Sequence, residues 1–324
     1  MPIIESVSVC IARVPLTNPV TFSTRRVTAR EYCLIRIRST DGHEGLGYCY
    51  AVNSAGRLLS VAATEVLAQK LIGQDSHRVE GLWSEMYQDA LLLGRAGAVM
   101  RALSAVDTAL WDLNARTAGW PLYRLLGATV LDRVPGYASG GYYWPGKTPE
   151  KLAEEMAGYV SEGFKAVKMK VGLESVANER KRIQAVREAI GDDVRLMLDA
   201  NNAWKDLPTA LEYARCFEPY NPFWLEEPFS PDDIDNHARL AKATPITYRR
   251  GRSGALAFQR PHHLRCDHAA PDRRNGLRRH NRMAPHRGNR CKPWNHYRTS
   301  CMARCPYSFG CCDSQLHLCR VDAR

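Results

Sequence analysis

The chain has 324 residues, of which 45% are hydrophobic and 24% are charged, as is ordinary for a globular protein. This length accommodates two domains, or one barrel with an appendage. The chain does not begin with a basic segment and an apolar run, and no stretch approaches the ~18 apolar residues of a membrane span. We therefore expect no signal peptide and no membrane anchor, and we expect a cytoplasmic location.

The net charge of +11 is concentrated at one end of the chain. Residues 247–324, which we name the tail, hold 16 Arg and 1 Lys against 4 Asp and no Glu, a balance of +13. Residues 1–246 hold the other 28 basic and 30 acidic residues, a balance of −2. The tail also holds 7 of the 11 cysteines and 7 of the 10 histidines. Only residues 1–246 therefore have the composition of an ordinary globular protein.

Residues 1–130 predict a small α+β domain. Alternation of apolar and polar residues predicts strands at residues 3–14, 31–38 and 44–51, with a hairpin turn at Asp41-Gly42. Helical periodicity then predicts helices at residues 56–72, 77–93 and 97–117.

Residues 131–246 change to a regular alternation of strands and helices. The expected strands are 133–141, 164–172, 194–200 and 222–228, and the expected helices are 149–162, 174–191, 207–217 and 231–243. This alternation indicates a parallel sheet, and four such units in sequence are typical of a (β/α) TIM-type barrel. The tail shows neither sustained helical nor strand periodicity, and we expect it to be disordered.

Three short strings carry charged residues at the ends of successive expected strands. Lys168 and Lys170 lie in VKMK, Asp199 and Asn201 lie in LDANN, and Glu226 lies in WLEEP. Residues two apart on a strand point to the same side, and the carboxyl ends of parallel strands meet at one edge of a barrel. Each string alone is more often structural, as a strand edge, a helix cap or a surface strand end. Their order and spacing favour one catalytic pocket.

The chemistry of these residues suits proton abstraction. Asp199 and Glu226 are hard oxygen ligands of the kind that Mg²⁺ takes, and the ion stabilises negative charge that develops on a neighbouring carboxylate substrate. Lys170 is the candidate base, because a second ammonium on Lys168 and partial burial both disfavour its charged form. Asn201 is a candidate hydrogen-bonding group at the substrate.

Residues 1–246 resemble the mandelate racemase/muconate-lactonising family of the enolase superfamily. The resemblance rests on ALSAVDTALWDLNARTAGWPLYRLLGA at 102–128 and on FKAVKMKVG, RLMLDANNAW and FWLEEP. It implies an α+β capping domain over 1–130, a (β/α)₈ barrel beginning at 131, one Mg²⁺ and a homo-oligomer. Lys170 resembles the family's base, Lys168 its neighbour that lowers the pKa, and Asp199 and Glu226 the first two metal ligands.

The lysine pair resembles the mandelate-racemase-type subgroup, which abstracts the α-proton of hydroxy-carboxylates and acid sugars through a stabilised enolate. Racemisation, epimerisation, cycloisomerisation and loss of water share this step, and the residues leave open which follows. The expected partner is a small carboxylate, without a membrane or nucleic acid. Ser139 and Tyr142, together with loops at Phe22–Arg26 and Tyr48–Asn53, are the candidate substrate-binding segments, and Asn201 resembles a further polar contact.

The resemblance stops at about residue 246. The family requires a third carboxylate about one unit after Glu226 and a later Asp/His pair, but no acidic residue lies between Asp235 and Asp267. We hypothesise a reading-frame slip near Ile246, because residues 248–253 read from the second base of each codon can encode Ile-Ala-Ala-Gly-Glu. The barrel would then be incomplete, lacking one ligand and the second base. We therefore expect the chain as written to be inactive or insoluble.

Two other interpretations of the tail stay open. Its charge of +13 is compatible with a nucleic-acid-binding extension, although no recognised motif is present. A zinc-binding module is the second alternative, although the spacing fits no paired C-x-x-C frame. Its candidate ligands would be Cys301, Cys305, Cys311, Cys312 and Cys319 with His296 and His317.

Overall fold

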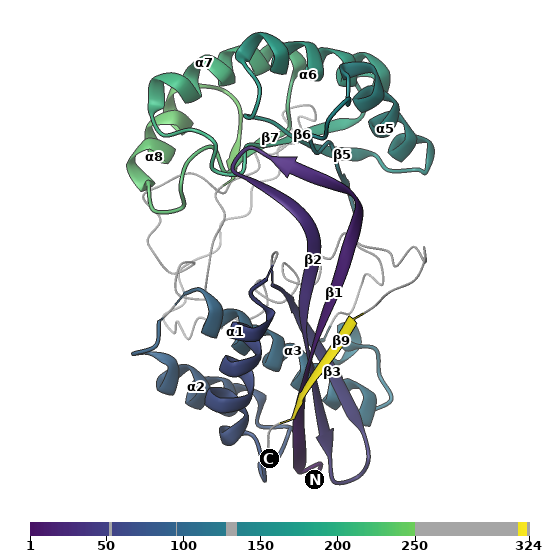
Figure 1. The fold of residues 1–324 in the computed structure, drawn as a ribbon, viewed down its shortest axis with the longest axis vertical. Coiled ribbons are helices and arrows are strands. Elements are labelled where there is room, and N and C mark those ends of the chain that lie inside the picture. The colour runs from purple at the N-terminus through teal and green to yellow at the C-terminus, as the bar shows by residue number, and fades with distance from the viewer. Residues whose placement is uncertain (52–53, 95, 128–134, 250–316, 323–324) are drawn as a thin grey trace, which may run out of the picture.

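The computed structural model describes the chain except residues 52–53, 95, 128–134, 250–316 and 323–324, and it contains two sheets. The antiparallel sheet has the order β3-β2-β1-β9 and the parallel sheet the order β4-β5-β6-β7-β8 (Figure 1). The strands are β1 (Ile4–Phe22), β2 (Arg25–Ser39), β3 (Glu44–Tyr50), β4 (Ala138–Ser139), β5 (Ala166–Lys170), β6 (Arg195–Asp199), β7 (Trp224–Glu226), β8 (Tyr248–Arg249) and β9 (His317–Asp322). The helices are α1 (Gly56–Val61), η1 (Ala62–Leu67), η2 (Ala68–Lys70), α2 (Val79–Ala90), α3 (Ala98–Thr117), α4 (Leu122–Leu125), α5 (Pro149–Ser161), α6 (Val176–Ile190), α7 (Leu207–Phe217), η3 (Glu218–Tyr220) and α8 (Ile234–Ala243).

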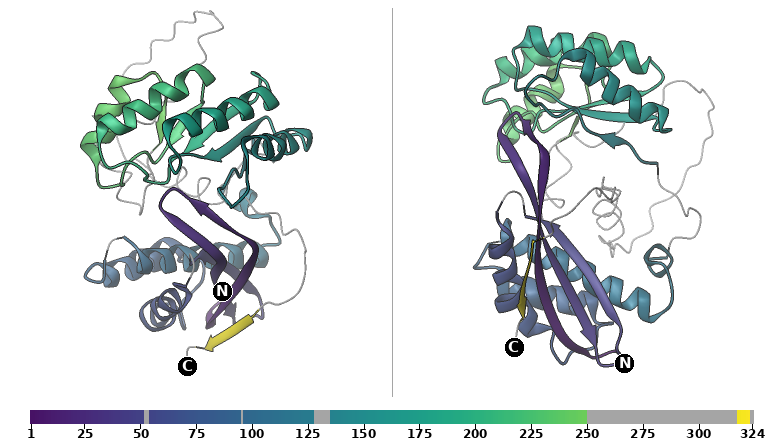
Figure 2. Two further views of the ribbon diagram at one scale, coloured as in Figure 1. Left: turned by 45° about the horizontal axis from the view of Figure 1, so that its top comes forward. Right: turned by 45° about the vertical axis from the view of Figure 1, so that its right-hand side comes forward.

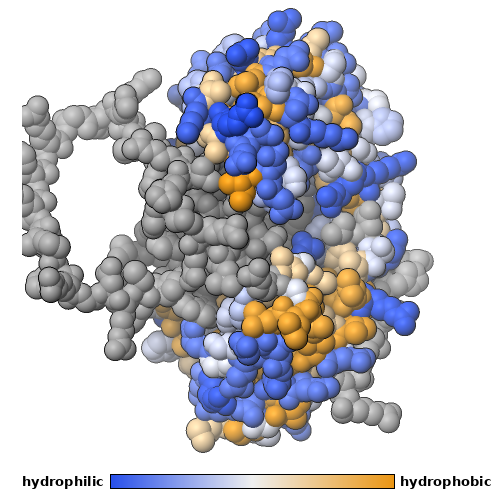
Figure 3. Space-filling view, turned by 90° about the vertical axis from the view of Figure 1, so that its left-hand side faces the viewer, coloured by the Kyte–Doolittle hydropathy of each residue, from blue (hydrophilic) through white to orange (hydrophobic). Residues whose placement is uncertain are grey.

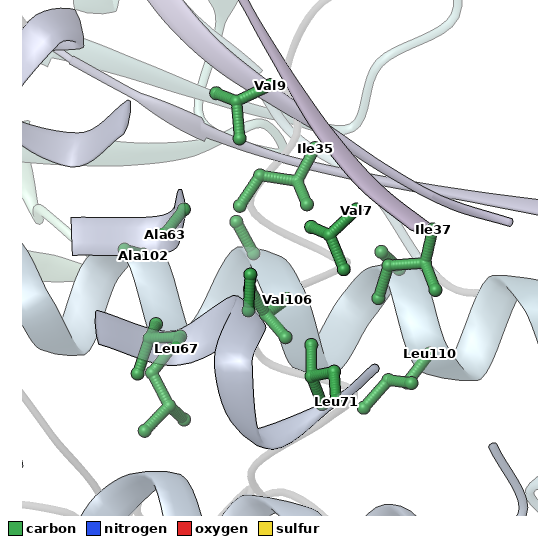
Figure 4. Close-up of a cluster of buried hydrophobic side chains, with 14 of the residues drawn as sticks. Val7, Val9, Ile35, Ile37, Ala63, Leu67, Leu71, Ala102, Val106 and Leu110 are labelled. Atoms are coloured by element: carbon green, nitrogen blue, oxygen red, sulfur yellow. The ribbon is translucent and has the colours of Figure 1, made fainter. Parts of the chain in front are cut away.

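The capping domain packs one face of its antiparallel sheet against α3 and the shorter helices. Figure 4 shows Val7 and Ile35 of the sheet pointing toward Leu67 and Val106 of the helices, and all four are buried. Helix α3 lies so close to β3 that a Cβ added at Gly47 would stand 2.0 Å from the carbonyl oxygen of Ala105. The absence of a side chain at this position therefore allows α3 to cover the sheet.

The first hairpin is much longer than the sequence predicts. Strands expected at residues 3–14 and 31–38 extend to Phe22 on one side and start at Arg25 on the other. The register shifts between Pro15 and Val20, where a proline has no N–H to continue the ladder. The ribbon leaves the capping domain and reaches the barrel (Figures 1 and 2).

Two helical segments also differ from the prediction. The single helix expected at 56–72 is divided into α1, a π-helical turn at η1 and a 3₁₀ turn at η2. The short helix α4 after Pro121 was not predicted, because four residues are too few to show a periodic pattern. Neither difference affects the barrel.

The barrel strands run parallel in chain order, and α5 to α8 cover one side of them (Figure 1). Each of these helices starts at a side chain that accepts a hydrogen bond from the first turn, at Thr148, Ser175, Asp206 and Asp233. Alternate strand residues, such as Leu196 and Leu198, are buried in the core with the helices. The intervening residues face the opposite side of the sheet, which is the inside of the barrel.

The fold is an α+β capping domain followed by an incomplete TIM-type barrel. The described residues of the tail contain two strands that the sequence did not predict: β8 is a fifth parallel strand beside β7, and β9 pairs with β1. The rest of the tail lies outside the described residues, and so do its expected disorder and the side chains of its candidate zinc ligands.

Within the described ranges, no helix has both the length and the apolar character needed to cross a bilayer. Figure 3 shows mostly hydrophilic side chains on the barrel half of one face, and apolar ones gathered on the capping half. Among the exposed apolar residues of the capping domain are Leu58 and Val61 of α1.

Candidate active site

The charged residues of the three strings form one row across three adjacent strands. Lys170 at the end of β5 is the register partner of Asp199 on β6, and Asp199 is the partner of Glu226 on β7. Lys168 lies two residues before Lys170 on the same side of β5. The structure thus brings together the four residues that the sequence proposed as base, neighbour and metal ligands.

These four side chains are buried and joined by short ion pairs. Lys168 Nζ lies 2.7 Å from Glu226 Oε2 and 3.2 Å from Asp199 Oδ2, and Lys170 Nζ lies 2.7 Å from Asp199 Oδ2. Lys168, Lys170, Asp199 and Glu226 are 8%, 7%, 3% and 8% exposed. Two positive and two negative charges therefore compensate each other within a small, poorly hydrated volume.

The ion pairs shift the pKa values of two members of the row. Burial lowers the pKa of Lys168, but the negative charges of Asp199 and Glu226 outweigh it, and the pKa is raised overall. Burial raises the pKa of Asp199, but the positive charges of Lys170 and Lys168 outweigh it, and the pKa is lowered overall. Both shifts favour the charged forms of Lys168 and Asp199, which stabilises the ion pair between them.

Aromatic rings from both domains line the lysines. Lys170 Nζ lies 5.7 Å from the ring centre of Phe22 and 5.3 Å from that of Tyr142, and Lys168 Nζ lies 5.6 Å from that of Tyr137. Phe22 stands at the end of β1, so the hairpin of the capping domain contributes directly to the wall. Rings at this distance stabilise a cation and exclude water from it.

The tip of the hairpin is fastened to the loop after β6. Ser23 Oγ donates to the carbonyl oxygen of Ala200, and Thr24 Oγ1 donates to that of Asn201 at 3.2 Å. Thr21 exchanges two backbone hydrogen bonds of 2.8 and 2.9 Å with Tyr143. The segment Phe22–Arg26, proposed from sequence as a substrate loop, is thus held next to the row of charges.

Asn201 lies beside the row in a left-handed backbone conformation, with φ of 47°. Its backbone N–H donates to Asp199 Oδ1 at 3.1 Å, and its side-chain Nδ2 donates to Glu227 Oε2 at 3.5 Å. Among the described residues, the buried Oδ1 of Asn201 has no hydrogen-bond partner. This oxygen is therefore available to a donor on a bound molecule.

Glu227 is a site residue that the sequence reasoning missed. It also has a left-handed backbone, with φ of 50°, and its carbonyl oxygen accepts from Asn202 N at 2.7 Å. Burial raises its pKa, and so do the negative charges of Asp199 and Glu226. Its position directly after Glu226 in WLEEP was the available signal.

The other residues proposed to bind substrate lie on β4, in the loop after it and in the capping domain. Ser139 on β4 is the register partner of Lys168 and is half-buried, and Tyr142 faces Lys170. Lys147 holds Tyr142 in place by donating to its carbonyl oxygen at 2.9 Å. The segment Tyr48–Asn53 ends outside the described residues, at 52–53.

A buried network behind Lys170 was also missed from the sequence. Arg182 on α6 donates to the carbonyl oxygens of Lys170 at 3.1 Å and Gly141 at 3.2 Å, and it pairs with Glu179 at 2.7 Å. Glu179 also accepts from Tyr143 Oη and from the backbone N–H of Gly172. The signal was available, because both charges occupy inward positions of α6 where its periodicity calls for apolar residues.

The donors of the row suit a hard divalent cation. Asp199 and Glu226 lie on neighbouring strands and present carboxylate oxygens, which are the donor atoms that Mg²⁺ prefers. No group of three or more His, Cys, Asp or Glu side chains that could hold a metal occurs in the described part of the chain. The residues present therefore supply two ligands, and in their current arrangement the ammonium groups of the lysines neutralise them.

Comparison with known proteins supports both domains. Residues 5–127 match the mandelate racemase/muconate lactonizing enzyme N-terminal domain, and residues 151–260 match the enolase C-terminal domain-like family. The C-terminal match continues beyond residue 246, where the sequence resemblance was expected to stop. The two matched segments cover the capping domain and the described barrel strands β5 to β8.

Individual relatives include enzymes of different reaction classes. The L-talarate/galactarate dehydratase of Salmonella typhimurium is 37% identical over 253 residues, which cover 75% of this chain and 62% of the relative. The 3,6-anhydro-alpha-L-galactonate cycloisomerase of Streptomyces coelicolor is 36% identical over 250 residues, covering 76% of this chain and 68% of the relative. The chain thus spans about two thirds of the length of these relatives.

A solved racemase structure from Streptomyces coelicolor with bound magnesium superposes with a TM-score of 0.75 and 34% identity, covering 79% of this chain and 72% of that one. The fold, the two matched domains and these identities agree with one another. The chain therefore belongs to the mandelate racemase/muconate-lactonizing enzyme family of the enolase superfamily.

Proposed function

We propose that this chain carries the proton-abstraction half of a Mg²⁺-dependent isomerase or hydro-lyase that acts on hydroxy-carboxylates, with acid sugars as the substrate class. The observation that carries the proposal is the buried row of Lys168, Lys170, Asp199 and Glu226. Relatives named as acid-sugar dehydratases and cycloisomerases support the substrate class.

Asp199 and Glu226 would hold the metal ion, which supplies a positive charge that stabilises the enolate of the substrate. Lys170 would remove the α-proton, because its Nζ lies in the row and is shielded from bulk water by Phe22 and Tyr142. With Asp199 and Glu226 holding the ion, Lys168 and Lys170 would lack their counter-ions, and the like charges of the two ammonium groups would repel each other.

The charge balance of the row favours an anionic substrate. With Lys170 as the neutral base, the other three residues sum to −1, so a divalent cation would leave one positive charge in a buried space. A substrate carboxylate would compensate this charge, and the additional negative charge of the enolate would compensate the ammonium that forms on Lys170 as the proton is transferred. A neutral substrate would leave the excess charge unpaired, which is costly in a buried site.

Polar groups around the row are suited to a hydroxylated substrate. The Oδ1 of Asn201 accepts no bond from a described residue, and Ser139 and Tyr142 bring hydroxyl groups to the adjacent strand and loop. We propose that these three residues bind substrate hydroxyls and thereby discriminate among acid sugars. After proton abstraction, protonation of the enolate would give an isomer and loss of a β-hydroxyl would give a dehydrated product.

The test is hydrogen exchange in D₂O. A frame-corrected version of the chain is incubated with Mg²⁺ and a panel of acid sugars, and deuterium at the α-carbon is followed by NMR. We expect exchange with at least one acid sugar, and we expect Lys170→Ala to slow it by roughly 10²- to 10⁴-fold. The exposed Lys181 on α6 provides the control Lys181→Ala, which should exchange normally. Undiminished exchange in Lys170→Ala would remove Lys170 from the role of base.

A further inference from the structure

Two cysteines face each other in the core of the capping domain, away from the proposed active site. Cys33 on β2 and Cys49 on β3 are direct register partners. Cys33 is buried and Cys49 is half-buried, and both pack in the hydrophobic cluster between the sheet and α3. Both are free thiols.

The ladder places the two cysteines directly opposite each other. The N–H of Ala51 donates to the carbonyl oxygen of Glu31 at 2.6 Å, which makes Glu31 and Ala51 a hydrogen-bonded pair. Cys33 and Cys49, two residues along, are then the next pair of that kind, with Cα atoms about 5.5 Å apart, which lies within the range of about 4.4 to 6.8 Å at which disulfides form. Side chains of such a pair stand farther apart than those of a non-hydrogen-bonded pair, but here a hydrogen bond between the two thiols brings the sulfur atoms together.

Other sulfur atoms of the described capping domain are less well placed. On the same face of β3, the positions before Cys49 are Gly45 and Gly47, which have no side chains. Cys10 is the register partner of Leu34, and it therefore points to the other face of the sheet. Within the described capping domain, Cys49 is thus the direct cross-strand partner of Cys33.

The surroundings give the two thiols different chemical characters. A hydrogen bond from Cys33 lowers the pKa of Cys49, and the positive charge of Arg101 lowers it further, against the opposing effect of burial. The same hydrogen bond and burial raise the pKa of Cys33. Arg101 is held at the end of β3 by its bond of 3.0 Å to the carbonyl oxygen of Tyr50. Cys49 is therefore suited to attack, and Cys33 to follow.

We propose that Cys33 and Cys49 form a thiol-oxidation site that is converted to an intramolecular disulfide by a small disulfide oxidant such as oxidised glutathione. The thiolate of Cys49 attacks one sulfur of the oxidant, a mixed disulfide forms, and one glutathione thiolate leaves. Cys33 then loses its proton to solvent and attacks the Cys49 sulfur, which releases the second glutathione. Two protein thiols are oxidised and one glutathione disulfide is reduced to two thiols.

The test maps disulfides directly and needs no enzymatic activity. The full chain is incubated with oxidised glutathione at neutral pH, the remaining thiols are alkylated, and non-reduced peptides are identified by mass spectrometry. We expect the peptide of Cys33 to be joined to that of Cys49. We also expect Cys216, whose pKa is raised by burial, to remain mostly alkylated as an internal control. If the chain as written is insoluble, the same mapping is done on the frame-corrected protein, because residues 1–246 are identical in both.

Variants test whether the reaction of the two thiols depends on the folded structure. Cys33→Ala should stop at the mixed disulfide, with glutathione retained on Cys49. Arg101→Met should slow the reaction of Cys49, and Arg101→Lys should restore it, while Cys216 is unaffected by either. The preference for the Cys33–Cys49 pair should disappear in urea. Linkage of Cys49 to a tail cysteine instead, or survival of both thiols under conditions that also spare Cys216, would overturn the proposal.

Discussion

At the scale of single residues, Lys168 has an unusual position because its ammonium bridges two carboxylates. Nζ lies 2.7 Å from Glu226 and 3.2 Å from Asp199 on two different strands. Such a bridge compensates charges that would otherwise repel each other in a buried site. It occupies the space between the two proposed metal ligands, so the ammonium and a divalent cation compete for the same oxygens.

This competition predicts the behaviour of Lys168→Met in the frame-corrected protein. Without Mg²⁺, the variant should lose about 3 to 5 kcal/mol of unfolding free energy, since Glu226 keeps a buried charge without its partner. With Mg²⁺, it should recover more stability than the native protein gains, because the ion no longer displaces an ammonium. Urea denaturation with and without MgCl₂ measures both effects. The exposed Lys181→Met is the control, and an equal response of Lys168→Met and the native protein to Mg²⁺ would contradict the prediction.

The sequence was sufficient to predict the row but not its environment. Spacing of one strand-helix unit places Lys170, Asp199 and Glu226 at equivalent strand ends, because a parallel sheet repeats that unit. Whether a charge is paired depends on side chains that are far apart in sequence, as between Lys168 and Glu226, which are 58 residues apart. The ion pairs and the resulting pKa shifts therefore required the three-dimensional structure.

At the scale of elements, α6 does more than cover the sheet. Its inward face carries Glu179, which is 0% exposed, and Arg182, which is 8% exposed. Together they bind backbone groups at the end of β5 and in the loop after β4, including the carbonyl oxygen of Lys170. The helix thus fixes the strand end from which Lys170 projects.

We expect Arg182→Met to lower the unfolding free energy by about 3 to 5 kcal/mol, because it leaves the buried carboxylate of Glu179 without its charged partner. The double variant Glu179→Gln/Arg182→Met should recover part of this loss, since the unpaired charge is then gone. Arg180→Met, on the exposed face of the same helix, should change stability by less than about 0.5 kcal/mol. Urea denaturation of the frame-corrected protein tests all three. If the double variant is no more stable than Arg182→Met, the unpaired charge of Glu179 is not the cause of the lost stability.

The elements themselves were predictable where a pattern ran for several residues. Helical periodicity predicted a helix at residues 97–117, and α3 spans Ala98–Thr117 with Val106 and Leu110 fully buried. The extension of β1 and β2 beyond residues 14 and 31 was not predicted, because only Val27 and Ala29 are buried on the added part of β2, and two apolar positions are too few to show alternation. Its residues contact the other domain instead, through Thr21 and Tyr143.

At the scale of the whole molecule, five parallel strands form a barrel that is not closed within the described residues. An open parallel sheet leaves edge strands and part of its interior without partners. The described site correspondingly offers two carboxylate ligands and one candidate base. The third carboxylate and the second base that the family resemblance implies would lie after the position of the proposed frame slip.

The slip predicts a difference between two polypeptides that share residues 1–246. The chain as written should be inactive or insoluble, whereas the frame-corrected chain should fold cooperatively and bind Mg²⁺, because it regains the third carboxylate and the remaining strands. Solubility, thermal unfolding and Mg²⁺ titration of both chains make the comparison. Sequencing of the gene decides the cause: an uninterrupted frame without an inserted or deleted base would refute the slip. A cooperatively folded, Mg²⁺-binding preparation of the chain as written would refute the expectation that it is inactive or insoluble.

The hairpin that reaches from β1 and β2 to the barrel sets an order of events during synthesis. Ser23 and its acceptor Ala200 are separated by 177 positions in the chain. At roughly 5 to 20 residues per second, the hairpin tip leaves the ribosome about 9 to 35 s before its partner. For most of that interval Lys170 has not yet been synthesised, and Phe22 has no lysine to cover. The pocket is therefore assembled late, after the capping domain has had time to fold.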